Sequence, residues 1–84
     1  MKVFAVRDKA SDSYLTPFFA PHEAMALRQF HLLRTDASTF VAQFPKDFDL
    51  FLLGEFDERT GHFSELSPCF LQSAVVAVEN PSND

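Results

Sequence analysis

The residues that could do catalytic or metal chemistry in this sequence are spread along the chain without the spacing that such chemistry needs. The three histidines are His22, His31 and His62. His22 and His31 are nine residues apart, so they cannot chelate one ion as an i, i+4 pair on a helix would. None of the three has a neighbouring Cys or carboxylate at metal-ligand spacing. We therefore predict that the chain binds no metal or cofactor and is not an enzyme.

Two carboxylates and one thiol are the remaining candidates for acid–base or nucleophilic chemistry. Asp47 and Asp49 lie at i, i+2 where a strand begins, and we interpret them as solvating the start of that strand. Cys69 is the sole cysteine, so it forms no internal disulfide, and we expect it to be a small buried hydrophobe in a reducing compartment. With Gly54 and Gly61 as its only glycines, the chain has no glycine-rich phosphate loop.

One group of residues could bind nucleic acid. Tyr14 lies near Arg7, Lys9 and Arg28, and rings interleaved with cations stack the bases of single strands. The overall charge opposes this interpretation, because the chain has 7 basic and 12 acidic residues and a net charge of −5. Nonspecific binding requires several clustered cations. We keep these four residues as candidate nucleic-acid contacts of a rival function.

The clearest element that could position such residues lies between residues 48 and 63. Phe48–Phe56 is apolar at both alternating sets of positions in mid-strand, which is typical of a strand covered on both faces. Residues 58–61 suit a four-residue loop, with Asp57 capping its start and Gly61 in the left-handed conformation. The pattern predicts a β-hairpin of which both faces need a cover.

The other segments predict an α+β fold with the order β-β-α-α-β-β. Residues 2–7 and 13–18 should pair as a hairpin. A helix is expected from Pro21 to about Arg34, and a shorter one, capped by Asp36 or Ser38, should end before Pro45.

Residues 71–78 favour a further C-terminal strand by their propensity. We expect a small antiparallel sheet with the helices packed on one face, residues 1–78 forming a single domain and residues 79–84 a polar tail.

So small a domain offers little burial for its apolar residues. A chain of 84 residues buries only roughly 60 to 65% of its extended surface, and residues 3–6 are, like the later strand, apolar on both faces. A homodimer through the sheet face or an unpaired edge would supply the missing cover. The candidate interface residues are Phe4, Val6, Phe51 and Leu53.

No apolar stretch is long enough for a membrane span, and the apolar run near the start is too short for a signal peptide. We expect a soluble intracellular protein without a membrane partner.

Several blocks of residues 2–63 together resemble one viral protein family. They are Arg7-Asp8-Lys9, Thr16-Pro17-Phe18-Phe19-Ala20-Pro21-His22, Pro45-Lys46-Asp47-Phe48, and Gly54-Glu55-Phe56-Asp57 followed by Thr60-Gly61. In these blocks and their spacing the chain resembles the small nonstructural protein of the gokushoviruses. These are microviruses, which are small bacteriophages with single-stranded DNA genomes.

That resemblance implies a protein that is made in the cytoplasm of the infected bacterium and is absent from the mature virion. Our hypothesis is a non-enzymatic, homodimeric accessory protein that supports viral single-stranded DNA synthesis or packaging. It would bind a protein of the replication or packaging machinery and no small-molecule substrate. Two alternatives remain open: a direct single-stranded DNA-binding protein, and an assembly chaperone or host-directed inhibitor.

Overall fold

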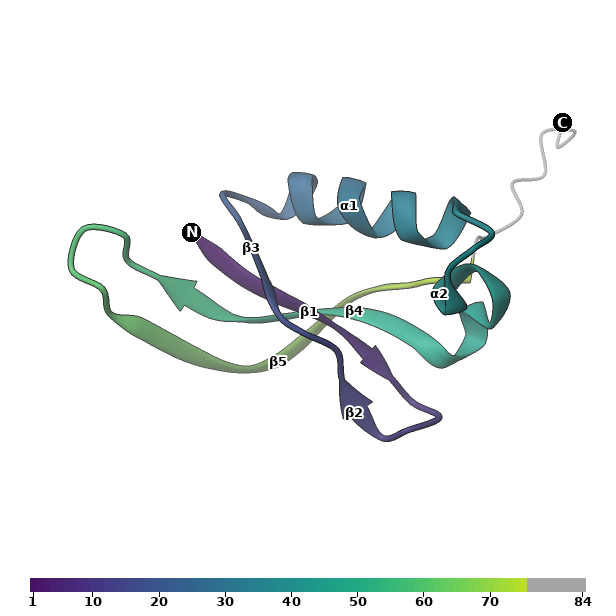
Figure 1. The fold of residues 1–84 in the computed structure, drawn as a ribbon. Coiled ribbons are helices and arrows are strands. Elements are labelled where there is room, and N and C mark those ends of the chain that lie inside the picture. Colours follow the sequence, from purple (N-terminus) through teal and green to yellow (C-terminus); the bar gives the residue numbers. More distant parts are fainter. Residues whose placement is uncertain (76–84) are drawn as a thin grey trace, which may run out of the picture.

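The structure is a computed structural model that describes residues 1–75, and it has the α+β architecture predicted from the sequence (Figure 1). Five strands form one antiparallel sheet, and the helices lie on one side of it. The elements in chain order are β1 (Lys2–Asp8), β2 (Ser13–Tyr14), β3 (Phe18–Ala20), α1 (Glu23–Thr35), α2 (Phe40–Gln43), the 3₁₀ turn η1 (Pro45–Asp47), β4 (Phe48–Phe56) and β5 (Phe63–Ser73).

β1 is the central strand of the sheet, whose order is β2–β1–β4–β5. β3 also pairs with β1, at residues 2–4, so it continues the edge that β2 forms at residues 7 and 8. The strand predicted over residues 13–18 is therefore split in two. Leu15 still donates to the Val6 carbonyl at 2.8 Å, but Pro17 has no N–H to give to a ladder. The strand order differs from the prediction by this one extra strand.

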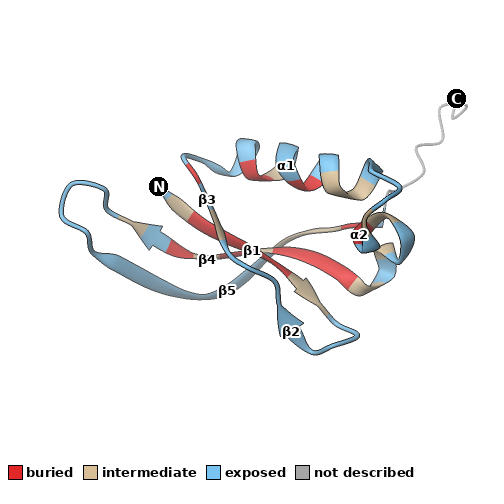
Figure 2. Cartoon of the chain, viewed as in Figure 1, coloured by how far each residue is buried: buried red, intermediate tan, exposed pale blue. Residues whose placement is uncertain are grey.

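The core lies between the sheet and α1, as predicted. Phe4 and Val6 of β1 pair with Leu52 and Leu50 of β4, and all four side chains are buried on this face. They form one cluster with other buried residues, among them Ala26 and Phe30 of α1, Val41 of α2 and Phe48. Figure 2 shows this burial concentrated along β1 and β4.

The helix ends differ from the sequence expectation by a few residues. α1 begins after His22, two residues later than expected, and the His22 side chain makes no capping bond. At its other end, Arg34 donates to the Ser73 carbonyl at 3.4 Å, which joins α1 to the end of β5. The cap of α2 is Thr39, which accepts from the Ala42 N–H, and the predicted caps Asp36 and Ser38 instead bond to each other.

The predicted β4–β5 hairpin is confirmed, including the bounds of β4. Asp57 Oδ1 accepts from the N–H groups of Arg59 and Thr60, and Gly61 has a φ of 79°. β5 is longer than expected, because it continues to Ser73 and absorbs the beginning of the strand predicted over residues 71–78. The rest of that prediction, from residue 76, and the predicted tail lie outside the described residues.

Most of β5 is exposed, as Figure 2 shows. Among the described residues it is an edge strand whose one partner is β4, and its first eight residues are all exposed. The expectation of a buried Cys69 is therefore wrong, since this residue lies in the exposed part of β5. Sequence hydrophobicity could not reveal that α1 and α2 leave this part of the hairpin uncovered.

Candidate interaction surface

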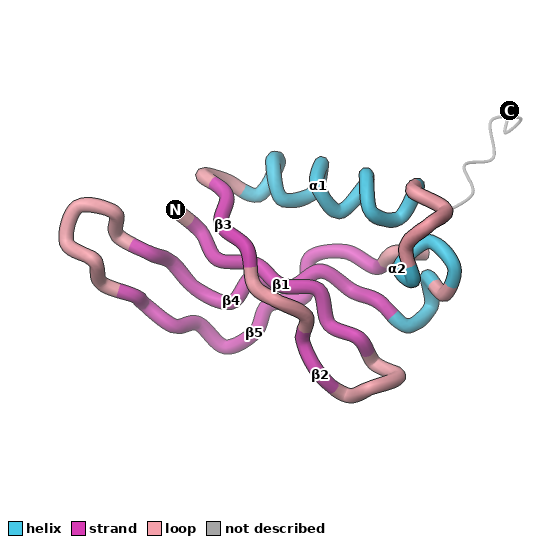
Figure 3. The backbone as a smooth tube through the Cα atoms, viewed as in Figure 1, coloured by secondary structure: helices cyan, strands magenta, loops and turns pink. Residues whose placement is uncertain are grey.

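One face of the sheet carries no helix of the described residues (Figure 3). Side chains alternate between the two faces of a strand. Because Phe4 and Val6 point toward α1, the residues between and beside them point the other way. We call the side opposite α1 and α2 the uncovered face.

Six aromatic rings lie on the uncovered face, as the strand register requires. Arg7 pairs with Tyr14, Ala5 with Phe51, and Phe51 with Phe70. Val3 pairs with Phe19 on one side and with Gly54 on the other. Phe56 lies two residues after Gly54, on the same face of β4, and pairs with Phe63. The rings fall into two groups, the Tyr14 cluster (Tyr14, Phe51 and Phe70) and the Phe19 cluster (Phe19, Phe56 and Phe63).

The Tyr14 cluster runs across the sheet from β2 to β5. The centroids of Tyr14 and Phe51 are 5.6 Å apart, and those of Phe51 and Phe70 are 5.9 Å apart, both with the rings nearly perpendicular. Edge-to-face contacts of this kind add roughly 0.5 to 1.5 kcal/mol to the burial of the rings. The contacts fix the ring positions, and Ala5, the β1 residue that pairs with Phe51, is fully buried.

The Phe19 cluster lies where the β4–β5 hairpin leaves the rest of the sheet. Phe19 of β3 contacts Phe56 at a centroid distance of 5.6 Å and Phe63 at 6.1 Å, and Phe56 and Phe63 are 4.8 Å apart. The three rings belong to β3, β4 and β5. Because β3 pairs with β1 and β5 pairs with β4, the ring contacts link strands that pair with different neighbours. The cluster holds the base of the hairpin against β3.

A hollow of about 400 Å³ lies next to the Phe19 cluster. It is lined by Val3, Leu53, Gly54, Phe63, Ser64 and Glu65. The register of β4 shifts between Leu52 and Gly54, so Leu53 has no cross-strand partner in β1 or β5 as the structure describes them. Leu53 lines the hollow. A bulge of this kind bends the strand and re-aims a side chain.

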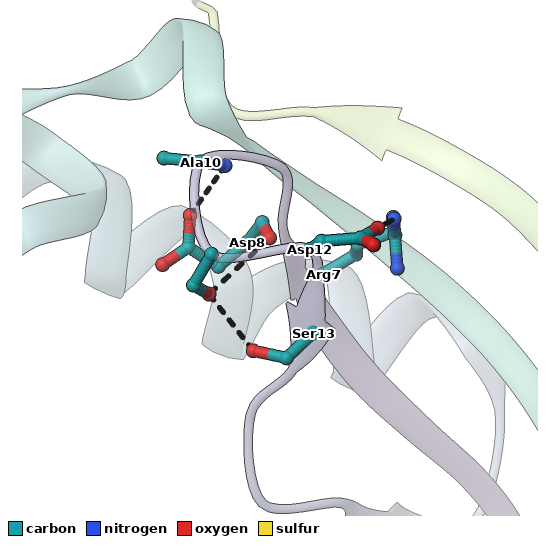
Figure 4. A network of polar contacts seen from close by, with 6 residues as sticks. Arg7, Asp8, Ala10, Asp12 and Ser13 are labelled. Carbon is teal, nitrogen blue, oxygen red and sulfur yellow. Dashed lines mark hydrogen bonds and ion pairs between the residues drawn. The ribbon is translucent and has the colours of Figure 1, made fainter.

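The cations of the uncovered face are paired with carboxylates of the same chain. Arg7 forms an ion pair with Asp12, as the close-up in Figure 4 shows, and its guanidinium carbon lies 5.2 Å from the centroid of the Tyr14 ring. Lys9 Nζ is 3.3 Å from Asp49 Oδ2, and Asp49 is buried. The end of the face around Arg7 and Lys9 is therefore close to electrically neutral. Near the Phe19 cluster, Glu65 adds a negative charge beside the hollow.

The structure brings together three of the four candidate nucleic-acid contacts. Arg7 and Tyr14 are paired residues on the uncovered face, and Lys9 follows at the end of β1. Arg28 is separate from them, because it is an exposed residue of α1, which packs on the other face of the sheet.

The candidate interface residues are divided between the two faces. Phe51 and Leu53 lie on the uncovered face, where Phe51 belongs to the Tyr14 cluster and Leu53 lines the hollow. Phe4 and Val6 lie in the core under α1, where they have no surface to offer a second chain. The sequence did not distinguish these pairs, because residues 3–6 are all apolar and alternation alone does not say which set faces the helices.

Four rings of the uncovered face are not among the candidate nucleic-acid contacts or interface residues predicted from the sequence. They are Phe19, Phe56, Phe63 and Phe70. A signal for two of them was present, because a four-residue loop over 58–61 sets Phe56 opposite Phe63 in the hairpin. Phe70 could not be placed from the sequence, since the register of β5 shifts after Glu65.

The other candidates for chemistry are dispersed in the structure. His22, His31 and His62 are exposed residues of three different elements or loops. Asp49 forms an ion pair with Lys9 and is not grouped with Asp47 as a pair of carboxylates. Within residues 1–75, no group of three or more His, Cys, Asp or Glu residues is arranged to hold a metal ion, and no helix has the length and apolar character to cross a membrane.

Comparison with known proteins gives one match. A protein-family model described as "Phage ORF5 protein" matches residues 1–77, which is nearly the whole chain. No curated protein and no solved structure matches the sequence or the fold.

Proposed function

The chain belongs to the Phage ORF5 protein family and is a bacteriophage protein, and from this premise we propose that it is a non-enzymatic accessory protein that acts as a homodimer. Its proposed role is to support viral single-stranded DNA synthesis or packaging through protein contacts. It would act in the cytoplasm of the infected bacterium and remain outside the mature virion. The resemblance of residues 2–63 to gokushovirus nonstructural proteins supports this finer role.

The observation that carries the proposal is the exposed apolar area of the uncovered face. Tyr14, Phe19, Phe63 and Phe70 are 38, 42, 66 and 55% exposed, which together corresponds to ~400 Å² of aromatic surface. The largest apolar patch on a typical monomer measures ~300 to 600 Å² and is often functional, so the exposed rings of the two clusters together reach that range. These rings also supply about half of the ~800 Å² that each partner buries in a standard interface.

The chemistry of the face favours an apolar protein surface over a charged ligand. Its rings are five Phe and one Tyr. Only the Tyr hydroxyl needs a hydrogen-bond partner when these rings are buried. Arg7 and Lys9 already have carboxylate partners, so a phosphate would have to compete with Asp12 and Asp49. A second copy of the same face meets these requirements, because two sheets pack face to face by interdigitating apolar side chains about 10 Å apart.

Analytical ultracentrifugation of the chain from about 1 to 200 µM tests the homodimer. We expect a monomer–dimer equilibrium whose Kd rises at least about tenfold in Phe70→Ser and in Phe63→Ser. The matched control is Phe40→Ser, which removes a ring at least as exposed from α2 on the other side of the sheet and should leave the Kd unchanged. A wild-type chain that stays monomeric at 200 µM would overturn the homodimer.

The pairing of Arg7 with Tyr14 favours a second candidate function, direct binding of single-stranded DNA. A ring with a guanidinium over it is a known platform for stacking a base, and Phe51 and Phe70 extend that platform across the sheet. This candidate stands second because the two nearby cations are neutralised within the chain.

Fluorescence anisotropy with a labelled 30-residue oligothymidine in low salt separates the two candidates. A DNA-binding protein would bind with an affinity that falls steeply with salt and would lose affinity in Tyr14→Ala. Arg28→Gln is the matched control, because Arg28 lies on α1, away from the uncovered face. No binding at about 20 mM salt would remove the DNA-binding candidate and leave the homodimer unaffected.

A further inference from the structure

A second exposed aromatic group lies on the opposite side of the molecule, on α2 and its C-cap residue. Phe40 is 70% exposed and Phe44 is 55% exposed, and their ring centroids are 6.3 Å apart. Thr39 holds α2 in place, since its hydroxyl donates to the Leu33 carbonyl at 2.7 Å and accepts from the Ala42 N–H at 3.2 Å. These hydrogen bonds fix the position of α2 and hence of the two rings. Both rings are exposed and neither belongs to the core.

These rings form part of a small notch between α2 and the turn that follows β1. It is lined by Asp8, Ala10, Phe40, Phe44, Asp47 and Phe48, and has a volume of about 140 Å³. That volume is well below the ~300 to 1,000 Å³ of a typical small-molecule site. It is of the size of a single amino-acid side chain.

The notch is acidic as well as aromatic. Two carboxylates line it, Asp8 and Asp47, and its lining contains no Lys or Arg. One oxygen of Asp8 accepts from the Ala10 N–H at 3.0 Å, which Figure 4 shows, and the ion pairs of the described residues do not include Asp8 or Asp47. Lys46 lines an adjoining hollow, which shares Phe44 and Asp47 with the notch.

Aromatic rings beside unpaired carboxylates fit one kind of occupant. The aliphatic stem of Lys or Arg packs on apolar surface while its charged head stays at a polar rim, and a cation is attracted both to the face of a ring and to carboxylates. We propose that this notch receives a single Lys or Arg side chain from the phage or host protein that the accessory protein binds. This inference rests on the proposed function, in which the chain acts through protein contacts.

The position of the notch is compatible with the proposed homodimer. α2 packs on the same side of the sheet as α1, so a dimer formed through the uncovered face leaves the notch free in both copies. Such a dimer presents two equal sites, and a partner with two basic side chains at the matching distance gains affinity by binding both.

Amide chemical shifts of the full ¹⁵N-labelled chain test the proposal without knowledge of the partner. The probes are three capped tripeptides with Lys, Arg or norleucine between two glycines, at up to about 20 mM. Norleucine keeps the apolar stem and lacks the charge. We expect the Lys and Arg peptides to shift the amides of Ala10, Phe44 and Asp47, more weakly in 0.5 M salt, and the norleucine peptide to leave them unchanged.

Two variants assign the binding to the notch. Asp47→Asn keeps the shape of the side chain and removes its charge, and Phe40→Ser removes a ring that the core does not need. Each should lower the affinity for the Lys peptide at least about threefold, whereas Phe63→Ser, on the uncovered face, should not change it. Equal shifts with the norleucine peptide, no shifts at all, or shifts that survive both notch variants would overturn the proposal.

Sedimentation of the same samples separates this proposal from the homodimer. If the dimer forms but the Lys peptide does not shift the notch amides, only the notch assignment fails. If the peptide binds the notch of a chain that remains monomeric, the homodimer fails and the notch assignment stands.

Discussion

Gly54 of β4 lies so close to Ser64 of β5 that a Cβ at residue 54 would come within 2.4 Å of the Ser64 carbonyl oxygen. The atom in the way belongs to the backbone, so a rotamer change cannot move it. The two strands approach here next to the bulge that carries Leu53. The lack of a side chain at Gly54 therefore sets the geometry of the hollow and of the Phe19 cluster beside it.

Gly54→Ala should thus destabilise the fold by roughly 1 to 3 kcal/mol, the usual cost of forcing extra atoms into a packed site. Urea unfolding followed by circular dichroism measures the change. Ser64→Ala is the control, because it leaves the carbonyl in place and should lie within about 0.5 kcal/mol of wild type. An unchanged unfolding midpoint in Gly54→Ala would contradict the close approach.

Gly61 is needed for a different reason. Its φ of 79° lies in the left-handed region, and no atom lies within 4 Å of a Cβ built there. Gly61→Val should cost about 1 to 2 kcal/mol through backbone strain alone, and Gly61→Asn should cost less because Asn tolerates this conformation. Equal losses in the two variants, measured by urea unfolding, would show that side-chain size rather than φ decides the effect.

The sequence was most informative where local chemistry determines the structure. The loop glycine, the Asp57 cap and the bounds of β4 follow from residue types within a few positions of one another. The faces of β1 and the exposure of Cys69 depend on how far α1 and α2 extend over the sheet. No pattern within a strand contains that information, so the sequence predicts an interface at Phe4 and Val6, whereas both side chains lie in the core.

The Asp57 cap should make the hairpin sensitive to acid. Hydrogen bonds from the N–H groups of Arg59 and Thr60 to its carboxylate lower the pKa of Asp57 below its usual value. A lowered pKa in the folded state stabilises the fold above the ordinary Asp pKa of about 3.9, and this contribution is lost as the pH falls through the lowered pKa. Asp36 has a lowered pKa as well, because the Ser38 hydroxyl and N–H donate to it.

Asp57→Asn removes this contribution at Asp57 while it keeps the size of the side chain. We expect the variant to unfold at lower urea concentration than wild type at pH 7. The difference should shrink as the pH falls below about 4, where Asp57 of the unfolded chain takes up a proton, and should be lost once the pH has fallen through the lowered pKa of the folded state. Asp36→Asn should behave in the same way at the other turn. A difference between Asp57→Asn and wild type that is constant from pH 7 to pH 2.5 would contradict the role of the charge.

Phe30 tests whether the single core between α1 and the sheet carries the stability of the fold. It is 1% exposed and belongs to the main core cluster. Phe30→Ala should cost about 3 to 5 kcal/mol, which is a large fraction of the 5 to 15 kcal/mol of a typical domain. Leu32→Ala, on the exposed side of the same helix, should cost under about 0.5 kcal/mol, and thermal unfolding followed by circular dichroism compares the two variants.

Cys69 reports which surface a homodimer uses. Its neighbour Phe70 points to the uncovered face, so Cys69 points to the opposite face, in an exposed part of β5 that neither α1 nor α2 covers. A dimer through the uncovered face leaves this thiol accessible, whereas a dimer in which two β5 edges pair would restrict access to it. Edge pairing is also hindered by Pro68, which has no N–H and lies within the irregular stretch of β5.

We therefore expect the Cys69 thiol to react with Ellman's reagent at a rate that is the same at 1 µM and 200 µM protein, across the range in which the dimer forms. Protection of Cys69 that increases with protein concentration would assign the interface to the β5 edge instead, and Cys69→Ser provides the blank for the reagent.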